Sequence, residues 1–275
     1  MKNILIPTDF SENARCATQF ALSYFADNTV TFHLLHVDFF PESSSGYDGY
    51  SSTATPLKSQ TSQFLKEEIQ RCQQLTTNPF HKFNPLVGEH SLIENIRRQV
   101  EEKNIDYIVM GTKGANKSNI KEIGSNAYEV ITKVKCPTIV IPEETQYKNT
   151  TNLALPTDFN NWDKDEMMTI LYETILIQKL NLHILQIKNK DQALTRIQQE
   201  NKDSLVEFLN KEDYTFHYLE NKNIDQEIQE YVDEIGIDMI ALVGRNLNFV
   251  QRLLFLPKSD NIDFHLKTPF LILHE

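Results

Sequence analysis

The chain has 275 residues and a formal net charge of −11. This length predicts two domains of roughly 135–140 residues each, and the negative charge argues against broad binding to nucleic acids or to anionic membrane surfaces. Three widely spaced cysteines, with no Cys-x-x-Cys pair, argue against a disulfide framework and a zinc site. No apolar stretch approaches about 18 residues and the N-terminus lacks a leader pattern, so we expect a cytoplasmic protein with no membrane span.

The first half of the chain alternates short apolar runs with amphipathic stretches. Strands are expected at Ile4–Ile6, Val30–Val37, about residues 80–87, Tyr107–Met110 and Thr138–Ile141. Helices are expected after Ser11 as N-cap, over about 58–76 and 89–103, and from about 126. Near-continuous apolar strands that alternate with helices are typical of a parallel sheet covered on both faces.

The second half repeats this pattern. Pro7-Thr8-Asp9-Phe10 recurs as Pro156-Thr157-Asp158-Phe159, an offset of 149 residues. The offset falls to 132 between Asn104–Gly111 and Gly236–Gly244, so the first copy has about 18 more residues between its second and third strands. They lie in the Ser/Gly/Tyr-rich segment Pro41–Pro56, which we expect to be a long loop.

The repeat predicts the domain organisation. We expect an α/β fold of two tandem domains, residues 1–145 and 150–275, each a doubly wound parallel five-stranded sheet with helices on both faces. The last strand of each copy, Thr138–Ile141 and Phe270–Leu273, is apolar and would lie at a sheet edge, where it would invite pairing. The two copies are therefore expected to pair as an internal pseudo-dimer, and a homodimer of the whole chain stays open.

The charge is spread unevenly over these two copies. Residues 1–145 contain 14 lysines and arginines against 17 acidic residues, a net of −3. Residues 146–275 contain 13 against 21, a net of −8. An anionic ligand is therefore easier to place in the first half.

A glycine-containing stretch, residues 111–126, follows the fourth strand of the first half, and we call it the glycine loop. Gly111 and Gly114 allow close approach of the backbone, and Gly124-Ser125-Asn126 precedes an amphipathic helix. Free amides in the first turn of that helix would suit an anion. Asn126 with Glu129 is expected to cap the helix. Turn geometry and a helix cap are the alternative explanation for these residues.

The complete spacing Gly111-x2-Gly114-x9-Gly124-Ser125 resembles the G-x2-G-x9-G-[S/T] signature of the ATP-binding universal stress proteins. The strand that ends in His36-Val37 and the closing strand CPTIVIP are similar to that family as well. The resemblance covers both halves and implies an adenine nucleotide α-hydrolase-like fold. It also implies a regulatory protein of the stress response that binds ATP, with or without Mg²⁺.

The resemblance implies two groups of nucleotide-binding residues. The adenosine would be held by Pro7, Thr8, Asp9 and Val37. The wall and the phosphate cradle would be formed by Met110, Gly111, Lys113, Gly114, Gly124, Ser125 and Asn126. The Asp9 carboxylate could accept hydrogen bonds from the ribose hydroxyls or the adenine amine, and the Val37 backbone could read the adenine edge. For Asp9 the alternative is a carboxylate that favours the start of a helix.

The second copy departs from the signature. Leu247 stands where Gly114 would be, and Pro257 and Lys258 replace Gly124 and Ser125. Proline lacks the N–H that a phosphate would need. We therefore expect a filled or closed site in the second copy, retained for structure, with Arg245, Arg252 and Lys258 leaving an anion there as the alternative.

Other functional signals are weak. The chain has neither a P-loop motif nor a G-x-G-x-x-G after its first strand. The scattered histidines predict no metal site, and no general base accompanies the glycine loop, so no catalytic residue is predicted. Enzymatic activity would be at most slow ATP hydrolysis or autophosphorylation. The alternatives are a weak ATPase, a scaffold that binds no nucleotide, or a protein that binds another small molecule.

Overall fold

A computed structural model describes residues 1–38, 54–112, 124–143, 145, 150–160, 166–188, 193–209, 214–220, 224–243 and 267–274. Most of the expected loop Pro41–Pro56 lies outside these ranges, and helix α2 begins at Ala54, four residues before the expected start of that helix.

The first half follows the order that its hydrophobic pattern predicts. Its strands are β1 (Lys2–Pro7), β2 (Val30–Asp38), β3 (Lys82–Glu89), β4 (Tyr107–Gly111) and β5 (Thr138–Ile141). Its helices are α1 (Glu12–Tyr24), α2 (Ala54–Leu75), α3 (Leu92–Lys103) and α4 (Ser125–Lys133). The hydroxyl of Ser11 accepts a hydrogen bond from the Ala14 N–H at 3.2 Å, which confirms Ser11 as the N-cap of α1.

The second half repeats these elements. Its strands are β6 (Asn152–Thr157), β7 (Asn181–Lys188), β8 (Tyr214–Glu220), β9 (Met239–Val243) and β10 (Phe270–Leu273). Its described helices are α5 (Glu166–Gln178), α6 (Arg196–Phe208) and α7 (Ile224–Ile235). Residues 244–266, which correspond to the glycine loop and α4 of the first half, lie outside the described part of the chain.

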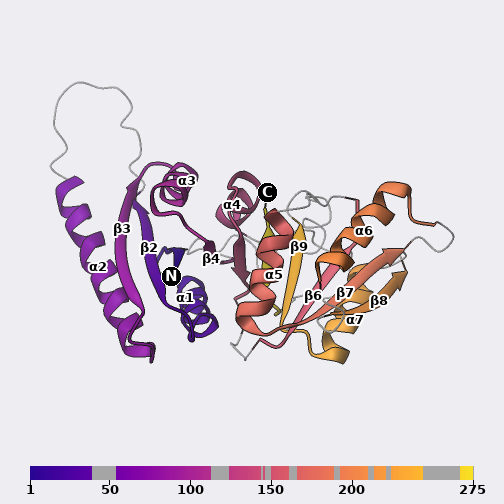
Figure 1. The fold of residues 1–275 in the computed structure, drawn as a ribbon. Helices are drawn as coiled ribbons and strands as arrows, with labels where there is room; N and C mark the ends of the chain where they lie inside the picture. The colour runs from indigo at the N-terminus through magenta and orange to yellow at the C-terminus, as the bar shows by residue number, and fades with distance from the viewer. Residues whose placement is uncertain are drawn as a thin grey trace, which may run out of the picture.

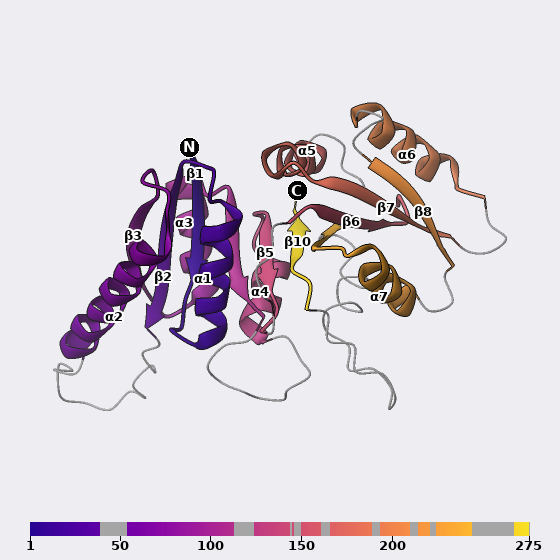
Figure 2. The same cartoon turned by 90° about the horizontal axis from the view of Figure 1, so that it is seen from below.

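The described strands form one ten-stranded sheet in the order β3-β2-β1-β4-β5-β10-β9-β6-β7-β8 (Figures 1 and 2). Neighbours within each half are parallel, whereas β5 and β10 are antiparallel, with Leu271 opposite Ile139. The doubly wound order 3-2-1-4-5 therefore occurs twice, the second time in reverse across the sheet. The expected pairing of the two last strands is present, and it joins the two expected sheets into one.

Helices cover both faces of this sheet. Ile4 and Ile6 of β1 point into a buried cluster to which α1, α2, α5 and α6 contribute. Leu5 points the other way, into a cluster with α3 and α4, and α7 covers the same opposite face in the second half. This alternation is the expected consequence of the two-residue period of a strand. Within the described ranges, none of the helices is long and apolar enough to cross a membrane.

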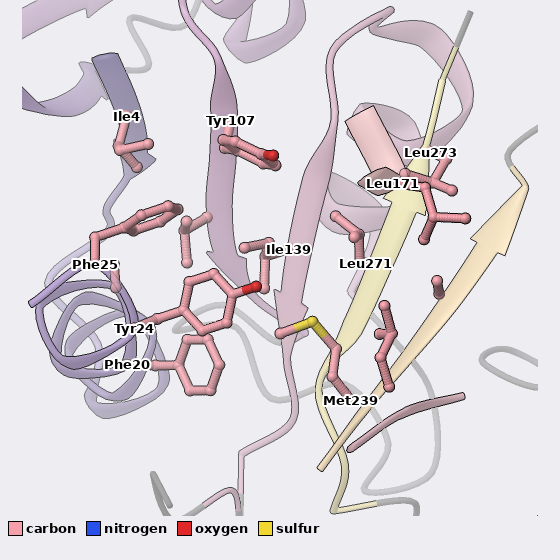
Figure 3. Close-up of a cluster of buried hydrophobic side chains, with 14 of the residues drawn as sticks. Ile4, Phe20, Tyr24, Phe25, Tyr107, Ile139, Leu171, Met239, Leu271 and Leu273 are labelled. Atoms are coloured by element: carbon pink, nitrogen blue, oxygen red, sulfur yellow. The ribbon is translucent and has the colours of Figure 1, made fainter. Parts of the chain in front are cut away.

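Two buried clusters cross the junction between the halves, and the larger of them contains side chains of α1 and α5. Phe20 and Tyr24 of α1 belong to the same cluster as Ile139 of β5, Leu271 of β10 and Leu171 of α5, as Figure 3 shows. These side chains exclude water together. The hydrophobic core of the first half is therefore completed by side chains of the second.

Polar contacts reinforce this junction. The Tyr107 hydroxyl lies 2.9 Å from Thr174 Oγ1, and both residues are buried. The Gln178 side chain donates to the Tyr24 carbonyl at 2.7 Å. Helix α5 of the second half is thus bonded to β4 and to the end of α1 in the first half.

Candidate functional site

Strand β1 ends in a tight turn whose side chains bond to its own backbone. The Thr8 hydroxyl accepts from the Phe10 N–H at 3.1 Å, and the Asp9 carboxylate accepts from the Ser11 N–H at 3.0 Å. Phe10 has a φ of 61°, in the left-handed region, which is uncommon for a residue other than glycine. Asp9 is exposed, so the turn presents its carboxylate at the carboxyl end of β1.

The turn after β6 has the same geometry. The Thr157 hydroxyl accepts from the Phe159 N–H at 3.0 Å, the Asp158 carboxylate accepts from the Asn160 N–H at 3.0 Å, and φ of Phe159 is 59°. Turns of this kind favour Thr and Asp because their short side chains bond to amides two residues on. The turn geometry accounts for the repeated Thr and Asp, so the recurrence of these two residues by itself carries no information about a ligand.

The predicted site segments of the first half meet at one edge of the sheet. Strand β1 lies between β2 and β4, with Pro7 opposite Leu35 and Ile4 opposite Tyr107. The carboxyl ends of these parallel strands therefore lie side by side, and the strand order reverses between β1 and β4. Doubly wound sheets bind their ligands at this reversal.

Two of the predicted binding residues point away from this edge. Val37 and Met110 are 7% and 5% exposed, and their side chains pack into the buried cluster with Ile93 and Ala127. Any contact that Val37 or Met110 makes with a ligand would therefore come from the backbone.

The end of β4 is packed tightly against α1. A Cβ atom on Gly111 would lie 1.8 Å from Asn13 Oδ1 and 2.6 Å from Asn13 Cγ, so a side chain has no room there. The N–H of Gly124 donates to the Thr112 carbonyl at 2.7 Å, which ties the start of α4 to the end of β4. Lys113 and Gly114 lie between these points, outside the described residues.

The start of α4 differs from the sequence prediction. Gly124 is the N-cap, with φ −60° and ψ 147°, and no side chain caps the helix. Asn126 is the second helical residue, so the predicted capping role of Asn126 is wrong, and Glu129 pairs instead with Lys133. The physical reason is that the Gly124 N–H bonds to the end of β4, so the chain enters the helix there. Ser125 and Asn126 are exposed in a first turn that lacks a side-chain cap, an arrangement that suits an anion.

Known proteins are similar to this chain in sequence and in fold. A family model for the universal stress protein family matches residues 1–142, which is just over half of the chain. The chain belongs to the universal stress protein family. No curated protein matches it.

Solved structures extend the similarity in fold to the whole chain. A universal stress protein from Archaeoglobus fulgidus DSM 4304 is 16% identical, covers 99% of this chain and 98% of its own length, and has a TM-score of 0.72. PA1789 from Pseudomonas aeruginosa PAO1, a protein of unknown function, is 14% identical over 99% and 92% of the two chains, with a TM-score of 0.55. A putative universal stress protein from Pseudomonas aeruginosa UCBPP-PA14 is 12% identical over 99% and 93%, with a TM-score of 0.53. At these identities the similarity establishes the fold.

In the second half of this universal stress protein, side chains of a helix donate hydrogen bonds to the turn after β6. The Gln198 side chain of α6 donates to the Asp158 carbonyl at 2.8 Å, and the Asn201 side chain donates to the Phe159 carbonyl at 2.7 Å. Helix α6 is therefore bonded directly to the turn that corresponds to Thr8–Phe10. The substitutions Leu247, Pro257 and Lys258, on which the predicted loss of a second site depends, lie outside the described residues.

The cysteines of this universal stress protein are unsuited to nucleophilic chemistry. Burial raises the pKa of the Cys72 and Cys136 thiols to about 12. Burial, with the nearby charge of Glu12, also raises the pKa of Cys16. Thiols with raised pKa values stay protonated at neutral pH and react slowly. Within the described ranges, no group of three or more His, Cys, Asp or Glu side chains could hold a metal ion.

Sequence reasoning missed two residues at this edge. Asn13 of α1 packs directly against Gly111 at the end of β4. Its position in the first turn of the helix that follows the first strand could have indicated this contact with the glycine loop. His36 bonds to the Thr8 carbonyl through Nδ1 at 2.7 Å. Its place at the end of β2, beside the turn after β1, could have indicated this contact.

Proposed function

We propose that the first half of this universal stress protein binds an adenine nucleotide, with ATP as the ligand, with or without Mg²⁺. In this proposal the second half is structural. The protein acts as a regulator in the stress response, and nucleotide binding changes its contacts with a partner protein.

One observation carries the proposal: the turn after β1 and the start of α4 lie at the same reversal of strand order. Gly111 allows β4 to end against α1, and the hydrogen bond from Gly124 to Thr112 sets the first turn of α4 beside the end of β4. The exposed carboxylate of Asp9 lies at the end of the neighbouring strand. A carboxylate that could accept from ribose or adenine and helix N–H groups that could donate to phosphate thus lie at the same ends of the strands, which supports the proposal.

The chemistry of the α4 terminus supports a phosphate ligand. Peptide N–H groups in the first turn of a helix have no partner within the helix, and the helix dipole favours negative charge there. Because no side chain caps α4, an anion could accept hydrogen bonds from these amides and from the exposed Ser125 hydroxyl. This arrangement offers a binding site to the phosphates of ATP even though the chain is acidic overall.

The described residues favour binding over catalysis. The Nδ1 atom of His36 is engaged by the Thr8 carbonyl, and its Nε2 atom faces Asp38 Oδ1 at 3.6 Å. Nδ1 is therefore occupied by the Thr8 carbonyl, and Nε2 is turned toward Asp38. We expect at most slow ATP hydrolysis or autophosphorylation. The competing function is a scaffold, or a site for another small molecule.

Isothermal titration of the full chain with ATP tests this proposal, and the repeated turn supplies a matched pair of variants. In Asp9→Asn and Asp158→Asn the amide oxygen can still accept the turn hydrogen bond, so both turns persist while the charge is removed. We expect one ATP per chain, a loss of affinity of about tenfold in Asp9→Asn, the size of a lost hydrogen bond, and no change in Asp158→Asn.

Three outcomes would contradict the proposal. No binding at millimolar ATP would favour the scaffold, and equal losses in the two variants would show that the site is not confined to the first half. Release of phosphate at many turnovers per minute, reduced in Asp9→Asn, would favour an enzyme.

A further inference from the structure

His36 touches the turn after β1 at two points. Its Nδ1 atom lies 2.7 Å from the Thr8 carbonyl oxygen, which can only accept, so Nδ1 carries the proton. Its ring is stacked on Phe10, with the ring centroids 4.6 Å apart and the planes inclined by 27°. A single side chain from β2 thus holds both the backbone before Asp9 and the ring after it.

The opposite side of the imidazole faces Asp38, the last residue of β2, which is itself bonded to α2. Nε2 faces Asp38 Oδ1 at 3.6 Å, and the same oxygen accepts a hydrogen bond from the Thr61 hydroxyl of α2 at 2.8 Å. The side chains of His36 and Asp38 are only 21% and 13% exposed. Phe64 of α2 also packs its edge against Phe10, with centroids 5.7 Å apart. Helix α2 therefore contacts Asp38 and Phe10, two neighbours of the His36 ring.

We propose that His36 is a positioning residue for the nucleotide site, which sets the direction of the Asp9 carboxylate by holding the Thr8 carbonyl and the Phe10 ring. The proposal rests on nucleotide binding in the first half. Asp9 lies between the Thr8 carbonyl and the Phe10 ring, the two groups that His36 holds. The backbone of Asp9 therefore cannot rotate without breaking the hydrogen bond to Nδ1 or the ring stack. A carboxylate fixed in this way loses less freedom when it binds a ligand.

The second half shows that the turn itself does not require this histidine. Leu35 lies opposite Pro7 and Leu185 opposite Pro156, so Gln186 occupies the place of His36. Gln186 is fully buried and accepts from the Lys202 ammonium of α6 at 3.0 Å. The second turn keeps the same backbone geometry although its carbonyls are held from α6. The first half therefore holds this turn through His36 of β2, whereas the second half holds it through Gln198 and Asn201 of α6.

Titration of the full chain with ATP tests the role of His36 through three variants. His36→Ala removes both contacts and is expected to weaken binding about tenfold, the size of a lost hydrogen bond. His36→Asn is expected to retain affinity within about threefold, because the asparagine amide nitrogen can take the place of Nδ1. Gln186→Ala, the matched control in the second half, is expected to leave affinity unchanged. Hydrogen exchange of the Phe10 and Ser11 amides is expected to be faster in His36→Ala alone.

The outcomes separate this proposal from the one on which it rests. If the wild type binds no ATP, the proposed function fails and this inference fails with it. If the wild type binds ATP and His36→Ala binds equally well, only the positioning role is overturned. Equal losses in His36→Ala and His36→Asn would overturn the role of the Thr8 bond, because both variants lose the ring stack on Phe10 and only His36→Asn can keep the bond.

Discussion

At the residue scale, packing against the side chain of Asn13 requires a glycine at position 111, whether or not a ligand binds. Gly111 ends β4 with the amide oxygen of Asn13 in the space that a Cβ atom would occupy. Glycine is the usual residue where one backbone approaches another group this closely. The first glycine of the signature is therefore explained by packing between α1 and β4, while the ligand would use the edge that this packing creates.

We expect Gly111→Ala to lower the free energy of unfolding by about 2 kcal/mol, because the new methyl group overlaps the Asn13 side chain. In an Asn13→Ala background the clash disappears, apart from the Asn13 carbonyl at 3.1 Å, and the cost of Gly111→Ala should fall by more than half. Urea denaturation of the four proteins of this cycle measures the difference. Additive costs would show that Asn13 is not the obstacle.

At the element scale, α5 joins the two halves. Thr174 donates its hydroxyl proton to the Ile170 carbonyl at 2.7 Å within α5, so the hydrogen bond between Tyr107 and Thr174 must have Tyr107 as its donor. Burial raises the pKa of Tyr107, which keeps the phenol protonated and able to donate. A helix of the second half thus depends on a strand of the first for one of its buried contacts.

We expect Tyr107→Phe to destabilise the protein by about 1 kcal/mol, because the buried Thr174 oxygen loses its donor. The double variant Tyr107→Phe with Thr174→Val should recover part of this loss. Tyr172→Phe is the control, since the Tyr172 ring packs on Phe208 and its hydroxyl has no hydrogen bond among the described contacts. Thermal denaturation can compare them, and equal losses in Tyr107→Phe and Tyr172→Phe would contradict the role of the buried bond.

At the scale of the whole molecule, the two repeats share one sheet and two buried clusters. The antiparallel pair of β5 and β10 continues the sheet across the junction, and the cluster in Figure 3 takes side chains from both sides of it. A division at residues 145 and 150 separates the repeats in sequence, but the cut would expose apolar surface on each piece. The domain boundaries remain a prediction of the sequence, while the packing favours a single cooperative unit.

We expect the chain to unfold in one transition, with β2 and β7 losing hydrogen-exchange protection at the same concentration of denaturant. Leu271→Ala, which removes a fully buried side chain of β10, should cost about 3 kcal/mol. It should lower the protection of both halves, although the change lies in the second. If β2 kept its full protection in this variant, the halves would be independent domains.

The sequence alone determined the order of strands and helices, the cap at Ser11 and the family, because apolar period, capping residues and motif spacing are local properties of the chain. It also indicated which edge strands would pair. The tertiary structure decided what depends on residues distant in sequence. It placed Asn13 against Gly111, moved the N-cap of α4 from Asn126 to Gly124, and turned the Val37 side chain into the core. It also merged two expected sheets into one, because an apolar edge strand and a shared core reach their lowest free energy only when both copies are present.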